Sequence, residues 1–231
     1  MKKNELFLHE EVLLLALRDE KGTVPSSTCI EFPLAGAMIA ELLLLERIRI
    51  DEKSKKKKLV DLVDGTPTGD DVLDEALRKI ATAKRRASLK NWVMRFRRMA
   101  RLKRRVAEGL CRKRILRAEE DKVLLVFKRT LYPEIDPKPE REMIERLRNA
   151  IFRDTGDVAP RTAVLVSIAK AADLLKIPFE KKKLKERKKQ IERIVDGELT
   201  GKATREAIEA MQAAVMVAVI LPAVISTTSS H

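Results

Sequence analysis

Apolar residues recur along most of this chain at the three- and four-residue spacing of amphipathic helices. Pro33 suits the first turn of a helix, and Thr68 or Asp70 suits the cap that precedes one. The pattern also contains a strongly apolar run over residues 6–17 and a basic helical region over 89–116. Further helices are predicted over residues 34–46, 71–83, 140–152, 161–175, 178–194 and 204–225.

Two segments have the pattern of strands. Residues 47–51 alternate between charged and apolar, and after a charged turn residues 59–63 can return as the second strand of a hairpin. Further on, Glu119–Asp121 is expected to form a turn before Val123–Phe127, a short apolar strand. Because this apolar run is continuous, Val123–Phe127 suits either a buried strand or the tip of a surface hairpin.

These elements predict a mainly α protein with a single domain over residues 1–231. We expect a helical bundle around an apolar core helix, with short surface β-hairpins. Ala210–Ile225, the apolar part of the longest charge-free stretch, is expected to be a buried core helix. Its roughly 16 residues fall short of the ~20 that span a bilayer, and a membrane anchor is the alternative.

The composition narrows the class of protein. Hydrophobic residues make up 45% and charged residues 36% of the 231 residues, which excludes a disordered chain and an ordinary membrane protein. Cys29 and Cys111 are isolated, so reduced thiols in a cytosolic compartment are expected. Met1–Asn4 leads directly into an amphipathic pattern, without the apolar region of a signal peptide.

The positive charge is concentrated in one segment. The chain has a net charge of +14, and residues 84–117 contain 15 basic residues and one acid, Glu108. The rest of the chain is therefore neutral. Such a segment suits an anionic polymer or an anionic membrane surface, and a solvated helix face is the simpler alternative.

No catalytic or metal-binding motif is complete. His9-Glu10-Glu11 begins like the helix of a zinc protease, but Leu13 stands where the second histidine would be. Gly197–Ala203 is one residue too short between its glycines for a phosphate-binding loop and lacks the Ser or Thr that ligates Mg²⁺. We therefore expect no catalytic residues, no bound metal and no cofactor.

Two kinds of partner suit the basic segment. An anionic membrane needs cations for its headgroups and apolar side chains that enter the interface, which Val123–Phe127 with Leu131 and Tyr132 would supply. Nucleic acid is the alternative, because a helix followed by a hairpin, as at 34–63 and 102–131, also resembles the end of a winged-helix domain. A third alternative is an oligomer that exchanges its hairpin between protomers.

Several motifs resemble one known family. LHEEVLLLALRDEKG at 8–22, GAMIAELLLLER at 36–47 and PTGDDVLDEAL at 67–77 are similar, in order and spacing, to the Golgi phosphoprotein 3 family. Asn91-Trp92 and the segment that ends in KVLLVF at Phe127 extend the resemblance, which covers about residues 5–225. It implies a mainly helical fold with a projecting hairpin. It also implies a peripheral membrane adaptor that binds phosphatidylinositol 4-phosphate, engages coatomer and retains glycosyltransferases through their cytosolic tails.

The resemblance also suggests site residues. The family's lipid pocket aligns a tryptophan with Ser26, an arginine with Ala35 and two further arginines with Ala100 and Lys103, so that only Lys103 keeps a positive charge. We expect an anionic-lipid surface formed by Lys103, Arg97, Arg98, Arg101, Arg104 and Arg105. The membrane-inserting hairpin is expected to present Leu124, Leu125, Val126, Phe127, Leu131 and Tyr132. The expected location is the cytosolic face of a membrane, the Golgi in a eukaryote, with membrane-protein tails as partners and a homo-oligomer through the hairpin as an option.

Overall fold

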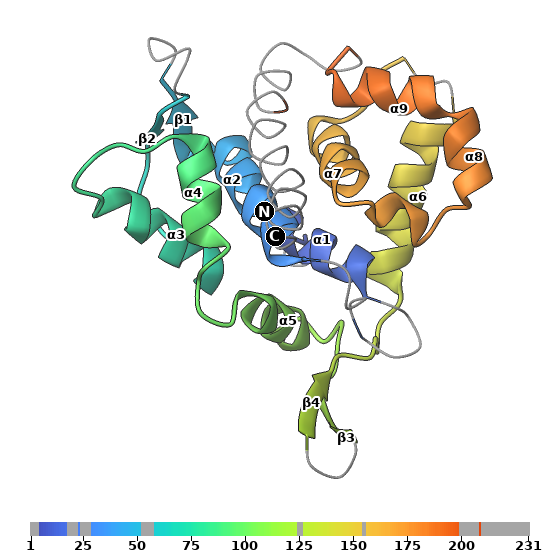
Figure 1. Cartoon of the computed structure of the whole chain (residues 1–231), viewed down its shortest axis with the longest axis horizontal. Helices are drawn as coiled ribbons and strands as arrows, with labels where there is room; N and C mark the ends of the chain where they lie inside the picture. Colours follow the sequence, from blue (N-terminus) through green and yellow to red (C-terminus); the bar gives the residue numbers. More distant parts are fainter. Residues whose placement is uncertain are drawn as a thin grey trace, which may run out of the picture.

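The computed structural model describes residues 5–17, 23, 29–51, 58–123, 127–153, 156–198 and 208, with the backbone alone at 121–123 and 127–129. It is mainly α, as the sequence predicts, with two antiparallel strand pairs among the described residues (Figure 1). The helices are α1 (Leu8–Ala16), α2 (Glu31–Leu44), α3 (Asp71–Ala81), α4 (Leu89–Phe96), α5 (Leu102–Arg112), α6 (Lys138–Phe152), α7 (Pro160–Ala171), the 3₁₀ helix η2 (Leu174–Lys176), α8 (Lys181–Glu186) and α9 (Lys188–Val195).

The first hairpin agrees with its prediction. Strands β1 (Ile48–Ile50) and β2 (Val60–Leu62) pair antiparallel, with Arg49 opposite Asp61. Two helix predictions are also confirmed closely. Helix α6 begins two residues before its predicted start, and α3 begins directly after Asp70, as predicted. The side chain of Asp70 accepts hydrogen bonds from the backbone N–H groups of Val72 and Leu73, which makes it the cap of α3.

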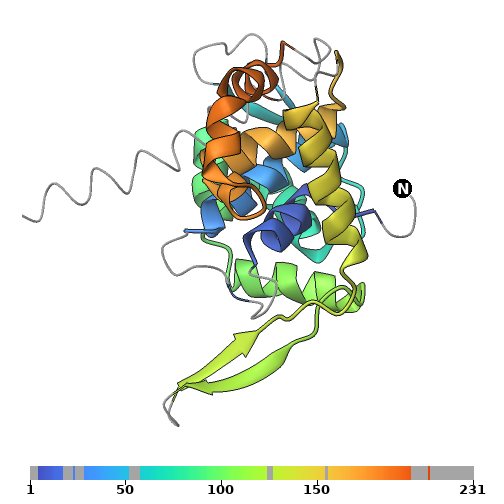
Figure 2. The same ribbon diagram turned by 90° about the vertical axis from the view of Figure 1, so that its right-hand side faces the viewer.

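The second hairpin departs from its prediction. Strand β3 (Glu119–Val123) pairs with β4 (Phe127–Leu131), so Glu119–Asp121 is strand instead of turn. Val123–Phe127 is not one strand, because Val123 and Phe127 face each other as the last pair before the connection. The ribbon projects away from the helices (Figure 2). Neither face of the ribbon packs on the core, so its sequence does not have to alternate between apolar and polar residues. The prediction of a single buried strand is therefore wrong, and residues 124–126 lie outside the described residues.

Three helical predictions are divided in the structure, and one of them, over 161–175, consists of α7 and the 3₁₀ helix η2. The basic region over 89–116 consists of α4 and α5, separated by a turn in which Arg101 has a φ of 53°. The segment over 178–194 consists of α8 and α9. Met99 and Leu102 are buried and continue the buried face of α4 across the break between α4 and α5. The spacing of apolar residues therefore continues there, although the helix itself is interrupted. Of the predicted helix over 204–225, including Ala210–Ile225, Ile208 alone is among the described residues.

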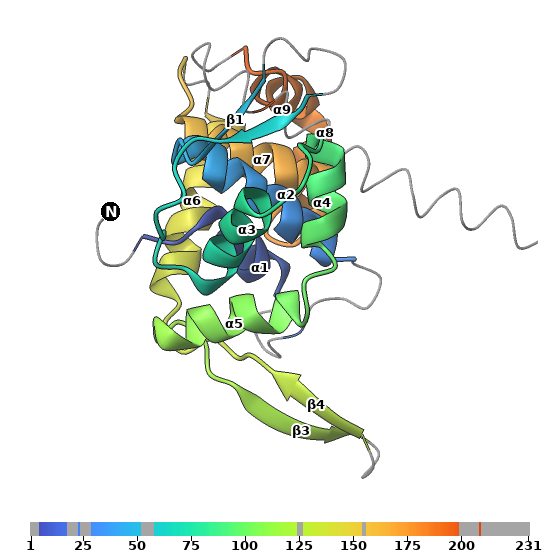
Figure 3. The ribbon, with the colours of Figure 1, turned by 90° about the vertical axis from the view of Figure 1, so that its left-hand side faces the viewer.

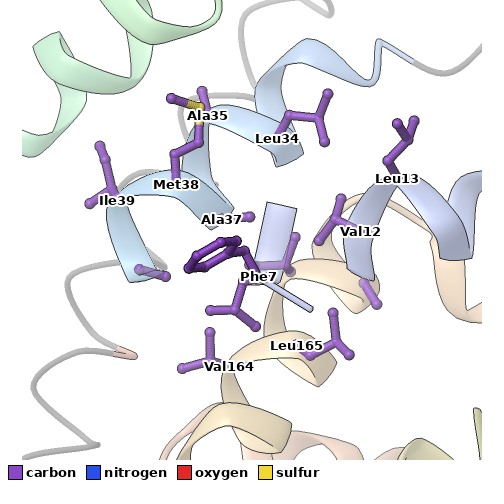
Figure 4. Close-up of a cluster of buried hydrophobic side chains, with 14 of the residues drawn as sticks. Phe7, Val12, Leu13, Leu34, Ala35, Ala37, Met38, Ile39, Val164 and Leu165 are labelled. Carbon is purple, nitrogen blue, oxygen red and sulfur yellow. The ribbon is translucent and has the colours of Figure 1, made fainter. Parts of the chain in front are cut away.

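Among the described residues, the central apolar element is α1. All nine of its residues are buried, and it packs against α2, α5, α6 and α7. Figure 4 shows Phe7, just before α1, pointing between Ala37 on α2 and the side chains of Val164 and Leu165 on α7. The buried apolar residues form a continuous cluster through these helices. The surrounding elements are therefore placed by their contact with a short, fully enclosed helix.

Three consecutive ionisable residues lie inside this core. His9 Nε2 is 3.3 Å from Asp70 Oδ1, which joins α1 to the start of α3. Glu10 forms an ion pair with Lys113 at the end of α5, and Glu11 forms one with Arg146 on α6. Burial raises the pKa of Glu11, although Arg146 and a second arginine oppose that rise. Each charged residue of α1 is thus paired with a different neighbouring element.

Glu41 on α2 completes this network. Its side chain is fully buried and accepts hydrogen bonds from Nη1 and Nη2 of Arg161, at 3.0 and 2.8 Å. It also accepts one from the backbone N–H of Leu8 at 2.6 Å, while Arg161 donates to the carbonyl oxygen of Leu6. The pair therefore fixes the start of α1 between α2 and α7.

We predict that Arg161→Leu lowers the free energy of unfolding by about 3–5 kcal/mol, because it leaves the carboxylate of Glu41 buried without its cation. Chemical denaturation followed by circular dichroism measures this loss. Arg153→Leu is the matched control, since Arg153 is 69% exposed and lies 3.9 Å from Glu145. That substitution should cost less than about 0.5 kcal/mol. Equal losses in both variants would contradict the role of the buried pair.

The Asp70 cap predicts a dependence of stability on pH. Burial alone would raise the pKa of Asp70, but His9 and the two backbone N–H donors outweigh it and lower the pKa from 3.8 to about 2. A carboxyl with a depressed folded pKa stabilises the protein above its unfolded pKa and loses that contribution as pH falls through the folded value. The stability difference between wild type and Asp70→Ala should therefore be constant near neutral pH and shrink between pH 3.8 and about 2.

Denaturation series at several pH values measure this difference. Asp70→Asn keeps an oxygen that can accept from the helix N–H groups, so it should lose less stability than Asp70→Ala, whose cost near neutral pH is about 1–2 kcal/mol. A difference between wild type and Asp70→Ala that persists unchanged to pH 2 would show that the charge of Asp70 has no part in the cap.

Candidate functional site

The basic segment is partly neutralised by acids that are distant in sequence. Arg86 lies 2.9 Å from Asp51 and 3.1 Å from Asp61, beside the first hairpin. On α5, Arg105 pairs with Glu75 of α3, and Arg112 lies 2.9 Å from Asp71. Arg104 pairs within its own helix with Glu108, at 2.7 Å. Each of these cations thus has a carboxylate partner within the protein. Two of them, Arg104 and Arg105, were among the expected lipid-binding residues.

Four other expected residues lie together at the turn between α4 and α5. We call Arg97, Arg98, Arg101 and Lys103 the α4–α5 cation cluster. Within the described part of the chain, none of the four has a carboxylate within ion-pair distance. Arg98 and Arg101 are exposed, whereas Arg97 and Lys103 are half-buried. The turn therefore carries four cations that no carboxylate of the described residues neutralises at ion-pair distance.

The cluster lies beside the first turn of α2. The guanidinium of Arg97 stacks over the ring of Phe32, with its carbon 4.4 Å from the ring centroid. Its Nε is buried and has no hydrogen-bond partner among the described residues. Burial lowers the pKa of Lys103, and the carboxylate of Glu31, at the start of α2, partly offsets that effect. Arg97 and Lys103 thus approach the same helix end from the two sides of the α4–α5 turn.

The N-terminus of α2 adds to the positive potential there. Its cap residue, Ile30, provides no side-chain acceptor for the first N–H groups of the helix. The N–H of Phe32 donates to the carbonyl oxygen of Cys29 at 3.4 Å and Pro33 has no N–H, so the helix dipole is the main feature that favours an anion at this end. Chemically, the site can hold an anionic group such as a phosphate between the α2 terminus and the cations of the cluster.

The structure separates the expected inserting residues. Leu124, Leu125 and Val126 lie outside the described residues, and Phe127 begins β4 opposite Val123. Leu131 is half-buried at the base of the ribbon. Tyr132 is 4% exposed; burial raises its pKa, and Arg104 on α5 opposes that rise. Tyr132 is therefore part of the packed base of the hairpin and is not available to insert into a membrane.

The positions suggested by the family pocket fall in different environments. Ser26 lies outside the described residues, and Ala100 is exposed in the α4–α5 turn. Ala35 is fully buried in α2, so an arginine there would point into the core of this protein. The surface next to the first turn of α2 is instead lined by Arg97, which reaches it from α4.

One exposed apolar residue was missed by the sequence analysis. Ile135 is 50% exposed at the base of the hairpin, where its backbone N–H donates to the carbonyl of Ile115 at 2.8 Å. The bridge between Leu116 and Glu134 extends the ladder of the ribbon to this point. A lone isoleucine between Pro133 and Pro137 has no periodicity, so the pattern of apolar positions could not identify it.

The described residues contain neither a membrane-spanning helix nor a metal-binding cluster. In the described part of the chain, no helix is long and apolar enough to cross a bilayer. The same residues contain no group of three or more His, Cys, Asp and Glu side chains that could hold a metal ion.

Comparisons with known proteins give one consistent result. The family model for Golgi phosphoprotein 3 (GPP34) matches residues 8–211. The vacuolar protein sorting-associated protein 74 of Schizosaccharomyces pombe is 27% identical over 224 residues, which cover 84% of this chain and 66% of that relative. The chain thus spans just under two thirds of the length of this curated relative.

Proposed function

The chain belongs to the Golgi phosphoprotein 3 family, and from this premise we propose that it is a non-enzymatic, peripheral membrane adaptor. It binds anionic phospholipid and presents a surface to the cytosolic tails of membrane proteins during trafficking or retention. The name of its fission yeast relative places that protein in vacuolar sorting, which is consistent with such a role. If the source is a eukaryote, the membrane is that of the Golgi.

One observation carries this proposal. The four residues of the α4–α5 cation cluster have no carboxylate partner in the described part of the chain. The β3–β4 ribbon runs beneath α5 (Figure 3). The end of the ribbon that is formed by Val123 and Phe127 points toward the side of the molecule on which the α4–α5 turn lies. Cations and an apolar hairpin on one side of a molecule are the two components that peripheral attachment requires.

The cluster supplies the headgroup contact. A phosphate placed at the first turn of α2 would be contacted by Arg97 from one side and by Lys103 from the other. Arg98 and Arg101 would face solvent and neighbouring headgroups. Lys103 is half-buried and its pKa is lowered by burial, so an anion beside it would favour its charged form. Phosphatidylinositol 4-phosphate, the ligand of the family, has a phosphate of this kind, and an arginine can bind it through two parallel hydrogen bonds.

The hairpin supplies the apolar contact. The sequence from Val123 to Phe127 is uninterrupted by charge, and Lys122 and Lys128 flank it. Val123 and Phe127 form the last strand pair of the ribbon, at the end farthest from the helices (Figure 2). Apolar side chains at this end would enter the interfacial region, and the flanking lysines would remain among the headgroups. Exposed Ile135, at the opposite end of the ribbon, lies too near the helices to replace this contact.

Nucleic acid remains the rival partner that an experiment must separate from lipid. A winged-helix protein would need a basic helix face directed at the duplex. On α5, however, Arg105 and Arg112 pair with Glu75 and Asp71 of α3. The pairing removes these cations from an extended basic face, and this favours the lipid.

We predict that Arg98→Glu with Arg101→Glu weakens binding to anionic liposomes by at least about thirtyfold, because each cation near an anionic surface contributes about 1 kcal/mol. Co-sedimentation with liposomes of different headgroups, with duplex DNA as competitor, measures the effect. Lys84→Glu with Arg85→Glu changes the net charge equally at the far end of the basic segment and is the matched control. The control should bind almost as the wild type does. Equal weakening in both variants would refute a localised site.

We also predict that Leu125→Glu with Phe127→Glu abolishes liposome binding while the helical signal in circular dichroism is retained. A charged side chain at these positions would have to enter the interface, which costs more than the attraction of a few cations restores. Val63→Glu, at another exposed apolar site, is the control and should leave binding unchanged. If the hairpin variant still pellets with liposomes, the insertion part of the proposal fails. Tight DNA binding that is unaffected by the hairpin variant would support the rival function.

A further inference from the structure

A groove lies at the other end of the molecule, between α7, η2, α8 and α9. It has a volume of about 270 Å³. Its floor is apolar and is formed by Leu175, Leu184 and Ile191, which come from three different elements. Five cations surround this floor: Lys170, Lys176, Lys181, Lys185 and Lys188. The only acid that lines the groove among the described residues is Asp173.

Most of the lysines at the rim are not neutralised. Asp173 is engaged with Lys176, at 2.6 Å, and Lys188 lies 3.7 Å from Glu192 in a weak exposed pair. Within the described part of the chain, Lys170, Lys181 and Lys185 have no carboxylate within ion-pair distance. All three are exposed. The rim therefore has a local positive potential above an apolar surface that is partly open to solvent.

These features specify the chemistry of an occupant. The ammonium of lysine is a point charge on a flexible side chain, so it can pair with carboxylates in many orientations. Bidentate hydrogen bonding to phosphate, by contrast, favours the planar guanidinium of arginine. The apolar floor requires apolar side chains in the ligand, which excludes a purely ionic one. A segment that places leucine-like residues on one face and acids on its flanks satisfies both conditions, as amphipathic helices in grooves do.

The position of the groove decides between a protein and a lipid. Figure 1 shows α8 and α9 at the opposite end of the molecule from the β3–β4 ribbon. If the ribbon and the α4–α5 cation cluster face a membrane, this groove faces the cytosol. That step rests on the proposed function. We propose that the groove is a docking site for an acidic, amphipathic segment of a cytosolic partner protein.

The test uses the full chain and a labelled helical peptide that has leucines on one face and glutamates on the flanks. Fluorescence anisotropy should give a Kd on the order of 10 μM, and a peptide with lysines in place of the glutamates should not bind. Lys181→Glu with Lys185→Glu should weaken binding at least about tenfold, because two attractive contacts become repulsive. Lys182→Glu with Lys189→Glu is the matched control, since these exposed lysines do not line the groove. The control should change the Kd less than about twofold.

Leu184→Ser tests the floor separately. It should weaken binding of the same peptide while the helical signal in circular dichroism is unchanged. Equal weakening by the two double-lysine variants, or equal binding of a peptide with the same composition in scrambled order, would overturn the docking site in favour of a diffuse basic surface. Failure of the wild type to bind the peptide would overturn it directly.

The peptide assay contains no lipid, so its outcome does not depend on membrane attachment. A protein that binds the peptide but no liposome would contradict the proposed function and leave the groove assigned. Loss of binding to anionic liposomes on Lys181→Glu with Lys185→Glu, with unchanged binding by the control, would overturn the peptide assignment, because the groove would then face the membrane.

Discussion

The complete burial of α1 is the constraint on which the rest of the structure depends. A nine-residue helix with no exposed face can carry charge only if every charged side chain meets a partner from another element. His9, Glu10 and Glu11 meet Asp70, Lys113 and Arg146, which come from the start of α3, the end of α5 and the middle of α6. The relative positions of these three helices are therefore linked through α1, and Glu41 with Arg161 links α2 and α7 to its start.

The same requirement organises the basic segment. Lys113 is paired with Glu10 of α1, and Arg105 and Arg112 are paired with acids of α3. These cations therefore already have carboxylate partners and are less available to attract a ligand. Among the cations of this segment that have no ion pair in the described part of the chain, four lie together in the α4–α5 cation cluster, at a turn where the left-handed backbone of Arg101 directly precedes α5. Its positive charge lies beside the uncapped end of α2.

The two proposed sites differ in chemistry because they lie at different ends of the fold. The α4–α5 cation cluster is rich in arginine and accompanies a ribbon that leaves the helices, which suits a phosphate-bearing interface. The groove between η2, α8 and α9 has lysines over an apolar floor, which suits carboxylates and aliphatic side chains. An adaptor needs such a division, since one surface must hold the membrane while another remains accessible to a soluble partner.

Local pattern accounts for much of the fold. The mainly α class, the β1–β2 hairpin and the Asp70 cap follow from the spacing of apolar residues and from short-range chemistry. The sequence also located the excess positive charge, since counting needs no coordinates. The breaks within the predicted helices over 89–116 and 178–194 could not be seen, because apolar spacing continues across both turns. Buried Met99 and Leu102 continue it across the first, and partly buried Leu184 and buried Ile191 lie on either side of the second.

What the sequence by itself determined is therefore the class of the fold, the family resemblance and the segment that holds the charge. The tertiary structure alone decided which of those cations are free, because the partners of Arg105, Arg112 and Lys113 are at least 30 residues away in sequence. It also decided that Tyr132 is packed at the hairpin base and that three lysines, without an ion pair to any described residue, lie at the rim of an apolar groove. Ion pairs and grooves form between distant segments, so no local pattern encodes them.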